Sequence, residues 1–350
     1  MEQNRKISML GEQSVLFSNA PCVIGYGNVV GLKEKEGPLG ALFDRVVDDE
    51  MAGGNNWEEA ESNLQFLAAD NAIQKAGIER KDLRYLLAGD LLGQLIATSF
   101  GMKEFGVPLF GLYGACSTMG EAAALGAVLV DGGYADKVLT LASSHFASAE
   151  KQFRFPLGYG NQRPLSASWT VTGSAALVIG DKPVREMGDI RIKGITTGKI
   201  VDYGVKDSMN MGAAMAPAAA ELIEAHLKDF AVKPAHYDRI ITGDLGHVGS
   251  EILVELLRQK EIDISACHID CGVEIYDQKT QDTHAGGSGC ACSGVVLTAF
   301  VFPKMKEGTW KRVLFVPTGA LLSQVSFNEG QSVPGIAHGI VFECGNERRR

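Results

Sequence analysis

The feature that most constrains the fold is an internal repetition: three short motifs occur twice along the chain in the same order. In each half, a buried strand follows an amphipathic helix, a Cys-containing turn then opens an apolar helix, and another buried strand comes next. The matched segments are 84–91 with 239–245, 115–117 with 291–293, and 138–143 with 313–318. Repeated strand–helix units are typical of an α/β fold. We therefore predict an α/β chain of two similar halves, with domains at residues 1–185 and 186–350.

A central helix is expected directly after Cys116. Thr118 and Glu121 have the spacing of a capping box, which marks a helix start. The helix would present one face of small residues, which lets another backbone approach closely: Gly120, Ala123, Ala124 and Ala127. Unpaired N–H groups at its start favour a thiolate or a bound anion. Cys116 is therefore a candidate functional residue, although a role as a small buried hydrophobic residue is the alternative.

Periodicity predicts the other main elements. The pattern indicates an amphipathic helix over Trp57–Ala76 that is closed by Gly77, and a hairpin within 170–180 that turns at Gly173. Further expected elements are strands at 23–30, 84–88 and 107–112, and helices at 91–105, 219–228 and 290–303.

Composition excludes several classes of function. The net charge of −9 argues against nucleic-acid binding as a main role. The seven cysteines are an odd number in a long chain, which suits a reducing cytoplasm rather than a disulfide framework. The first residues are polar, so we expect no signal peptide, and the apolar run at 290–303 is too short to span a bilayer.

A zinc site is the alternative use of the cysteines in the second half. Cys267, Cys271, Cys290 and Cys292 lie in two pairs, with His268 beside the first. The two pairs are spaced differently, and the second lies in an apolar helical run, whereas structural zinc sites usually show two tight pairs. We expect no metal and no cofactor.

The segment from His145 to Trp169 combines aromatic, polar and basic residues without a clear period. Long irregular segments in compact domains are usually functional or disordered, and the aromatic content argues against disorder. The cations Lys151, Arg154 and Arg163 could pair with a carboxylate, and the rings could line a slot for a flat ligand. Each arginine could instead form a surface ion pair.

The duplicated pattern, with a cysteine at the start of a buried central helix, resembles the thiolase superfamily, and residues 335–343 are similar to its last hairpin. This resemblance covers nearly the whole chain and implies a five-layered αβαβα fold. Longer runs resemble a dipicolinic-acid-binding branch of the superfamily from spore-forming bacteria; they are 114–121, 143–146, 152–157 and 169–173. That branch implies a dipicolinate-binding component of the spore's uptake and release machinery.

Condensing enzymes of this superfamily use the counterpart of Cys116 as acyl nucleophile, supported by a histidine and by an asparagine or a second histidine. Here the first supporting place falls at residues 243–244 and the second at Gly287, while His247 and His284 are displaced by a few residues. A thiol nucleophile needs a base and oxyanion donors, so the departure favours a binding protein without catalysis. The alternatives are an acyl-thioester condensing enzyme or thiolase that uses Cys116, and a structural partner with a vestigial pocket.

Dipicolinate is a flat ring with two carboxylates, so its site should offer an apolar slot, hydrogen-bond donors and cations. Because the carboxyl ends of strands collect sites in such sheets, Ser144 and His145 should open on the same cavity as the helix start. The expected ligand-binding residues are Cys116, Ser117, Ser144, His145, Lys151, Arg154, Arg163, Trp169 and His247. His145 could instead be a structural histidine.

The resemblance also implies partners and a location. The partners are dipicolinate, which calcium could accompany, and membrane proteins of the spore dipicolinate channel. The location is the cytoplasmic face of the spore inner membrane, with peripheral attachment. A homodimer is the usual assembly of the superfamily, and an exposed strand edge near residues 107–113 would be its contact.

Overall fold

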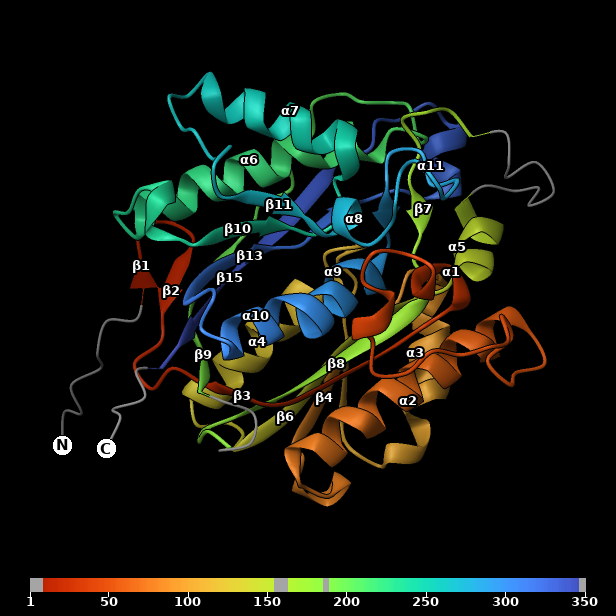
Figure 1. The fold of residues 1–350 in the computed structure, drawn as a ribbon, viewed down its shortest axis with the longest axis vertical. Helices are drawn as coiled ribbons and strands as arrows, with labels where there is room; N and C mark the ends of the chain where they lie inside the picture. The colour runs from red at the N-terminus through yellow and green to blue at the C-terminus, as the bar shows by residue number, and fades with distance from the viewer. Residues whose placement is uncertain (1–8, 154–162, 185–188, 346–350) are drawn as a thin grey trace.

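The computed structural model describes residues 9–153, 163–184 and 189–345. These residues form five layers, with helices outside, two half-sheets inside them and a helical layer at the centre (Figure 1). The expected α/β fold with an αβαβα arrangement is confirmed. The three buried clusters of apolar side chains match these layers, because one lies around the central helices and one lies under each outer pair.

The two half-sheets have the same strand order and the same pairing directions. In the first half the order is β5-β4-β6-β8-β3, and in the second it is β11-β10-β13-β15-β9. The strands are β3 (Cys22–Val30), β4 (Tyr85–Gly89), β5 (Leu109–Gly111), β6 (Lys137–Ser144), β8 (Gly173–Gly180), β9 (Ile190–Thr197), β10 (Arg239–Thr242), β11 (His268–Asp270), β13 (Arg312–Val316) and β15 (Gly335–Cys344). The half-sheets join where Cys22 pairs with Arg191.

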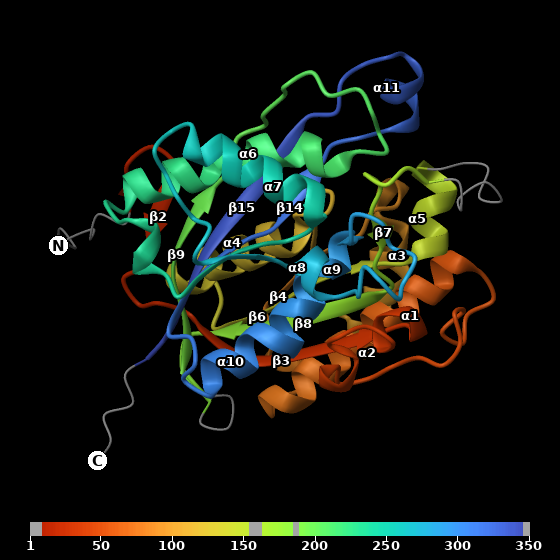
Figure 2. The same cartoon turned by 45° about the horizontal axis from the view of Figure 1, so that its top comes forward.

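The helices form the other three layers. The outer ones are α2 (Trp57–Ala76) with α3 (Ile96–Met102), and α6 (Met211–Asp229) with α7 (Gly246–Arg258). The centre holds α4 (Thr118–Asp131), α9 (Cys290–Val296) and α10 (Phe302–Lys306), the last two joined by a π-helical turn at Leu297–Val301 (Figures 1 and 2). The predicted bounds of α2 are confirmed, since the Asn56 side chain accepts from the Glu59 N–H and Gly77 adopts the left-handed conformation that ends the helix.

Small residues allow the central helices to pack closely, as their spacing predicts. A Cβ on Gly120 of α4 would lie 3.0 Å from the Pro317 side chain. On Gly294 of α9 it would lie 2.9 Å from Ala175 and 3.3 Å from Met119. The central layer therefore has no room for larger side chains at these points.

Two local expectations were wrong. The hairpin at 170–180 does not form, because β7 (Trp169–Thr170) pairs in parallel with β12 (Gly287–Ser288), while β8 runs between β3 and β6. Gly173 serves close packing rather than a turn, since a Cβ there would lie 2.6 Å from the Val29 oxygen. The capping box is also absent, because the Thr118 hydroxyl donates to the Ala115 oxygen at 2.6 Å.

The remaining α-helices and β-strands are short. They are β1 (Met9–Leu10), β2 (Ser14–Leu16), α1 (Leu32–Lys35), α5 (Phe146–Phe153), α8 (Cys271–Glu274), β14 (Thr318–Ala320) and α11 (Gln324–Asn328). None of the helices in the described ranges has the length and apolar character needed to cross a bilayer.

Candidate functional site

Cys116 lies at the start of the central helix α4 and borders a small internal cavity. The cavity has a volume of about 30 Å³, roughly the space of one water molecule. Cys116 is 5% exposed, and its Sγ lies 3.8 Å from the Ser288 Oγ. The lining residues are Leu91, Tyr113, Ala115, Cys116, Ala149, Ser168, Thr170, Met211, Ser288, Gly289, Ala320 and Leu322.

A strained turn presents the thiol. Ala115 has a φ of 49°, a left-handed conformation that costs energy for a residue with a Cβ. Hydrogen bonds hold the turn: the Ser117 hydroxyl donates to the Gly114 oxygen at 2.7 Å, and the Cys290 thiol donates to the Ala115 oxygen at 2.9 Å. Ser117, expected at the ligand, is fully buried, and its hydroxyl also lies 3.2 Å from Nδ1 of His338.

The surroundings of Cys116 disfavour a thiolate. Burial raises the pKa of the thiol well above its usual value, and the nearby carboxyl of Asp244 raises it further. Burial also raises the pKa of Asp244 to about 7, against the hydrogen bond of 2.6 Å that the Thr318 hydroxyl donates to it. The thiol is therefore protonated near neutral pH, which is the opposite of an activated nucleophile.

The two displaced histidines do not line the Cys116 cavity in the described part of the chain. His247 is half-buried in the first turn of α7, and its backbone N–H donates to the Ala285 oxygen at 2.8 Å. His284 Nδ1 lies 2.8 Å from the Pro164 oxygen, and its Nε2 lies 2.9 Å from Asp282. Neither is among the described residues that line the Cys116 cavity.

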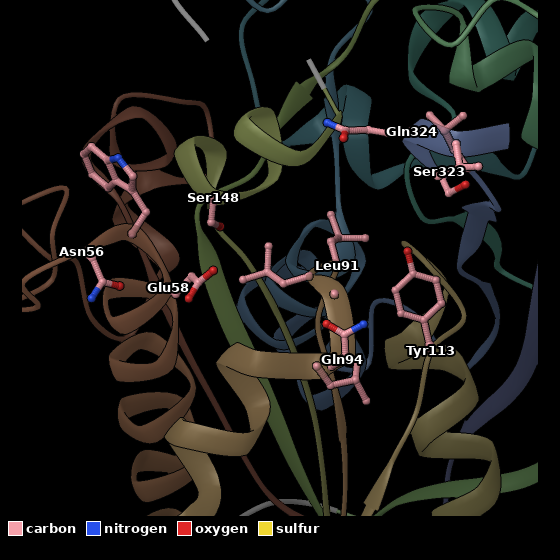
Figure 3. Close-up of a pocket in the computed structure, with 14 residues that line it drawn as sticks. Asn56, Glu58, Leu91, Gln94, Tyr113, Ser148, Ser323 and Gln324 are labelled. Atoms are coloured by element: carbon pink, nitrogen blue, oxygen red, sulfur yellow. The ribbon is translucent and has the colours of Figure 1, made fainter. Parts of the chain in front are cut away.

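A much larger pocket adjoins this cavity, with a volume of about 890 Å³ (Figure 3). The two share Leu91, Tyr113 and Leu322, so the large pocket leads towards Cys116. The start of α2, the loop at 91–95, α5 and α11 supply its walls, and the labelled side chains surround one space. The lining residues are Asn56, Trp57, Glu58, Leu91, Leu92, Gly93, Gln94, Leu95, Tyr113, Ser148, Leu322, Ser323, Gln324 and Val325.

Buried carboxyl groups support one wall of this large pocket. The Ser148 hydroxyl, in the wall, donates to Glu61 at 2.6 Å, and Asp90 accepts from the backbone N–H of Leu92 at 2.8 Å. Burial and the charge of Asp90 raise the pKa of Glu61 to about 8. The supported loop carries backbone strain, since Gln94 has a φ of 57° and the next residue one of 54°. Strained backbone often clusters at binding sites.

The side chains of Ser144 and His145, at the end of β6, bond within the fold. The Ser144 hydroxyl donates to the Val171 oxygen at 2.7 Å and accepts from the Ala291 N–H at 3.1 Å. His145 is fully buried, and its Nε2 lies 2.7 Å from the Glu50 oxygen. Burial lowers the pKa of this histidine. Neither residue is among the described lining of the two cavities.

Of the basic candidates, the structure describes the side chain of Arg163 alone. Arg163 packs against Trp169, with its Cζ 4.9 Å from the ring centroid. Lys151 belongs to α5, but its side chain is not among those described, and Arg154 lies outside the described residues. The described ranges contain no group of three or more His, Cys, Asp or Glu side chains that could hold a metal ion.

Some pocket residues had a sequence signal that pointed to them, and others did not. The loop at 91–95 follows the carboxyl end of β4, where sites collect in such sheets, so its position was predictable. Ser323 and Gln324 come from a short segment late in the chain, and Ser288 comes from the strand that pairs with β7. Only tertiary contacts bring these three residues to the site.

The fold is that of condensing enzymes. Solved structures similar to this chain include 3-oxoacyl-[acyl-carrier-protein] synthase III from Aquifex aeolicus, with 14% identity, a TM-score of 0.54, and coverage of 92% of this chain and 99% of that one. A variant of OleA from Xanthomonas campestris is 16% identical, with a TM-score of 0.58, and coverage of 93% and 99%. Thiolase-like architecture is therefore the class to which the chain belongs.

The family is narrower than this class. The family model described as Stage V sporulation protein AD (SpoVAD) matches residues 11–343. The Stage V sporulation protein AD of Bacillus subtilis (strain 168) is 44% identical over 337 residues, which are 96% of this chain and 98% of that protein. The chain belongs to the Stage V sporulation protein AD family.

Proposed function

We propose that the protein binds dipicolinic acid without catalysis, in the large pocket that leads to Cys116. Membership of the sporulation family supports a role in the spore. The observation that carries the non-catalytic part is that neither His247 nor His284 is among the described residues that line the Cys116 cavity, so the buried thiol has no imidazole base there. The alternative, a condensing enzyme or thiolase that uses Cys116, would have to use the buried carboxyl group of Asp244 as its base, since no histidine is among the described lining residues.

Pocket size supports the large pocket as the place where the ligand binds. The inner cavity, about 30 Å³, holds little more than one water molecule. The large pocket, about 890 Å³, lies within the range of small-molecule sites. It combines leucine side chains with polar groups that can orient a carboxylate or a ring nitrogen: Asn56, Gln94, Tyr113, Ser148, Ser323 and Gln324.

The charge of the pocket suggests how a dianion enters. Among its described lining residues, Glu58 is the one charged side chain, and it is acidic. A dianion beside a carboxylate is repelled unless a cation lies between them. We therefore propose that calcium accompanies dipicolinate, with carboxylate oxygens as the ligands that calcium prefers.

Location and partners follow from the same proposal. We place the protein at the cytoplasmic face of the spore inner membrane as a peripheral component of the dipicolinate channel. Its partners there would be the membrane proteins that carry dipicolinate across. Attachment through such partners would explain how a chain without a spanning helix in its described ranges acts at a membrane.

Calorimetric titration with dipicolinate, with and without calcium, tests the proposal. Tyr113→Ala should weaken binding about tenfold, because Tyr113 lines both the pocket and the inner cavity. Tyr134→Ala is the matched control, since Tyr134 is 69% exposed beyond the far end of α4. Saturable binding that only Tyr113→Ala weakens supports the proposal.

The enzyme alternative has its own readout. The purified protein is incubated with acyl-thioesters, and acylation of Cys116 is measured by mass spectrometry. Rapid acylation with turnover would overturn the non-catalytic proposal. Absence of dipicolinate binding in a folded, monodisperse sample would overturn the ligand assignment.

A further inference from the structure

Arg163 and Lys33 meet on Trp169, outside both cavities already described. The Arg163 Cζ lies 4.9 Å from the ring centroid of Trp169, and the Lys33 Nζ lies 4.4 Å from it. The Arg163 side chain is 1% exposed. Its Nη2 donates to the backbone oxygen of Asp282 at 2.9 Å and to the carboxylate of Asp282 at 3.1 Å. Two cations therefore share one indole ring, and one of them is almost fully buried.

Strand geometry places this pair away from Cys116. Ser168 and Thr170 line the inner cavity, and Trp169 lies between them in the chain. Successive side chains of a strand point to opposite faces, so Trp169 faces away from that cavity. Ser288, which contributes to the Cys116 cavity, pairs with Thr170. The cation pair and Cys116 therefore lie on opposite sides of β7.

Arg163 retains donors that have no acceptor. Its Nε and Nη1 are buried and have no hydrogen-bond partner within the described part of the chain. Of the five N–H groups of a guanidinium, these two nitrogens carry three. Burying donors of a cation without acceptors is costly, because the lost hydration is not replaced. A bound anion would satisfy them, whereas Asp282 only orients the guanidinium through Nη2.

We propose that Arg163 and Lys33 form a second ligand site, which binds a carboxylate group on the side of β7 opposite Cys116. Phe146 already stacks on Trp169, with centroids 5.6 Å apart and planes at 20°. The site therefore recognises the negative charge and not an aromatic ring. Dipicolinate carries such a group, and in naming it the proposal rests on the proposed function.

Fluorescence of Trp169 reports this site directly. The chain has three tryptophans, so Trp57→Phe with Trp310→Phe leaves Trp169 alone. Because Trp57 lines the large pocket, calorimetry first checks that this background still binds dipicolinate as the wild type does. Dipicolinate should change its emission saturably. Arg163→Gln should weaken that binding about tenfold to a hundredfold, which is the usual contribution of hydrogen bonds to a charged group. Lys33→Gln should weaken it about two- to fivefold, as expected for a partly exposed cation.

The control is Lys137→Gln. Lys137 is a half-buried lysine at the start of β6, whereas Phe146, which stacks on Trp169, follows the end of that strand, so this variant should leave binding unchanged. Thermal melts check each variant, because Arg163→Gln also removes the bonds to Asp282. If Arg163→Gln does not fold, Lys33→Gln still decides, because Lys33 is only half-buried.

The outcomes separate this inference from the proposed function. Dipicolinate binding by calorimetry, with an unchanged Trp169 signal and unchanged affinity in both variants, overturns the second site alone. If dipicolinate does not bind at all, the proposed function fails, and acetate and inorganic phosphate then probe the site. A Trp169 response to acetate that Lys33→Gln weakens supports a carboxylate site. A response to phosphate alone, or to neither anion, overturns it.

Discussion

Asp244 shows how one residue changes what an enzyme-like fold can do. It lies beside Cys116, where condensing enzymes would need a base, and its carboxyl group raises the pKa of the thiol. Its own pKa is raised to about 7 by burial, so it loses its proton near neutral pH. Above that pH its negative charge opposes a thiolate at Cys116 most strongly.

Asp244→Asn should therefore make Cys116 more reactive. The substitution keeps the size of the side chain and removes the charge, so the pKa of the thiol should fall. Each unit of that fall raises the thiolate fraction about tenfold. Alkylation of Cys116, followed by mass spectrometry at about pH 8, measures the effect, and Asp181→Asn on the surface is the control. An unchanged rate would mean that burial alone sets the pKa.

Between elements, buried polar groups join α2, β4 and β6 behind the large pocket. The Ser143 hydroxyl of β6 donates to Glu61 of α2 at 2.8 Å, and Gln65 of the same helix donates to Ser143 at 2.8 Å. Asp90 follows β4 and accepts from the Thr98 hydroxyl of α3 at 2.6 Å. Burial raises the pKa of both carboxyl groups. When pH rises, Glu61 and Asp90 lose their protons and become charged in the interior, so the packing of these elements depends on pH.

The contribution of Glu61 to the stability of the protein should fall as pH rises from about 4.5 to about 8. The pKa of Glu61 is 4.5 in an unfolded chain and about 8 in the folded protein. Between these two values the folded state therefore binds more protons than the unfolded state. Stability falls wherever the folded state binds more protons. Thermal melts across the window measure the slope. Glu61→Gln should remove this contribution, so the stability of that variant should fall less, or rise more, with pH than that of the wild type, whereas Glu255→Gln on the surface of α7 should leave the slope unchanged. An equal slope in all three proteins contradicts the assignment.

At the scale of the whole molecule, one sheet edge is exposed and apolar. β5 is the last strand of the first half-sheet, and Leu109 and Phe110 in it are 42% and 47% exposed. On the central helix α4, which packs against β4 and β6, Leu125 and Val128 are also exposed. Unpaired strand edges with apolar side chains tend to pair with another chain. We propose that two copies pair here as a homodimer, continuing the sheet.

Phe110→Lys should shift the protein from dimer to monomer, because it places a charge in the proposed contact. Light scattering after size-exclusion chromatography gives the mass. Ile200→Lys is the matched control, since Ile200 is 65% exposed and follows β9 in the other half-sheet. A wild-type monomer, or equal masses for both variants, would contradict the proposed dimer.

Sequence patterns predicted the elements correctly where interactions between residues close in sequence determine the structure. The bounds of α2 and the repeated strand–helix order follow from spacing, caps and apolar runs, which act over a few residues. The same reasoning failed at Gly173. A glycine is needed there because the backbone of β3, which is distant in sequence, packs against it too closely for a Cβ. It also failed at Thr118, whose hydroxyl turns back to the Ala115 oxygen.

The sequence by itself determined the thiolase-like class, the position of Cys116 and the absence of a histidine at residues 243–244. Only the tertiary structure decided how the candidate residues are grouped. It commits Ser144 and His145 to bonds within the fold, and it places Arg163 and Trp169 on the other side of β7 from Cys116. The physical reason is that strand alternation and long-range pairing decide which face a side chain occupies, and neither is encoded within the segment that carries the residue.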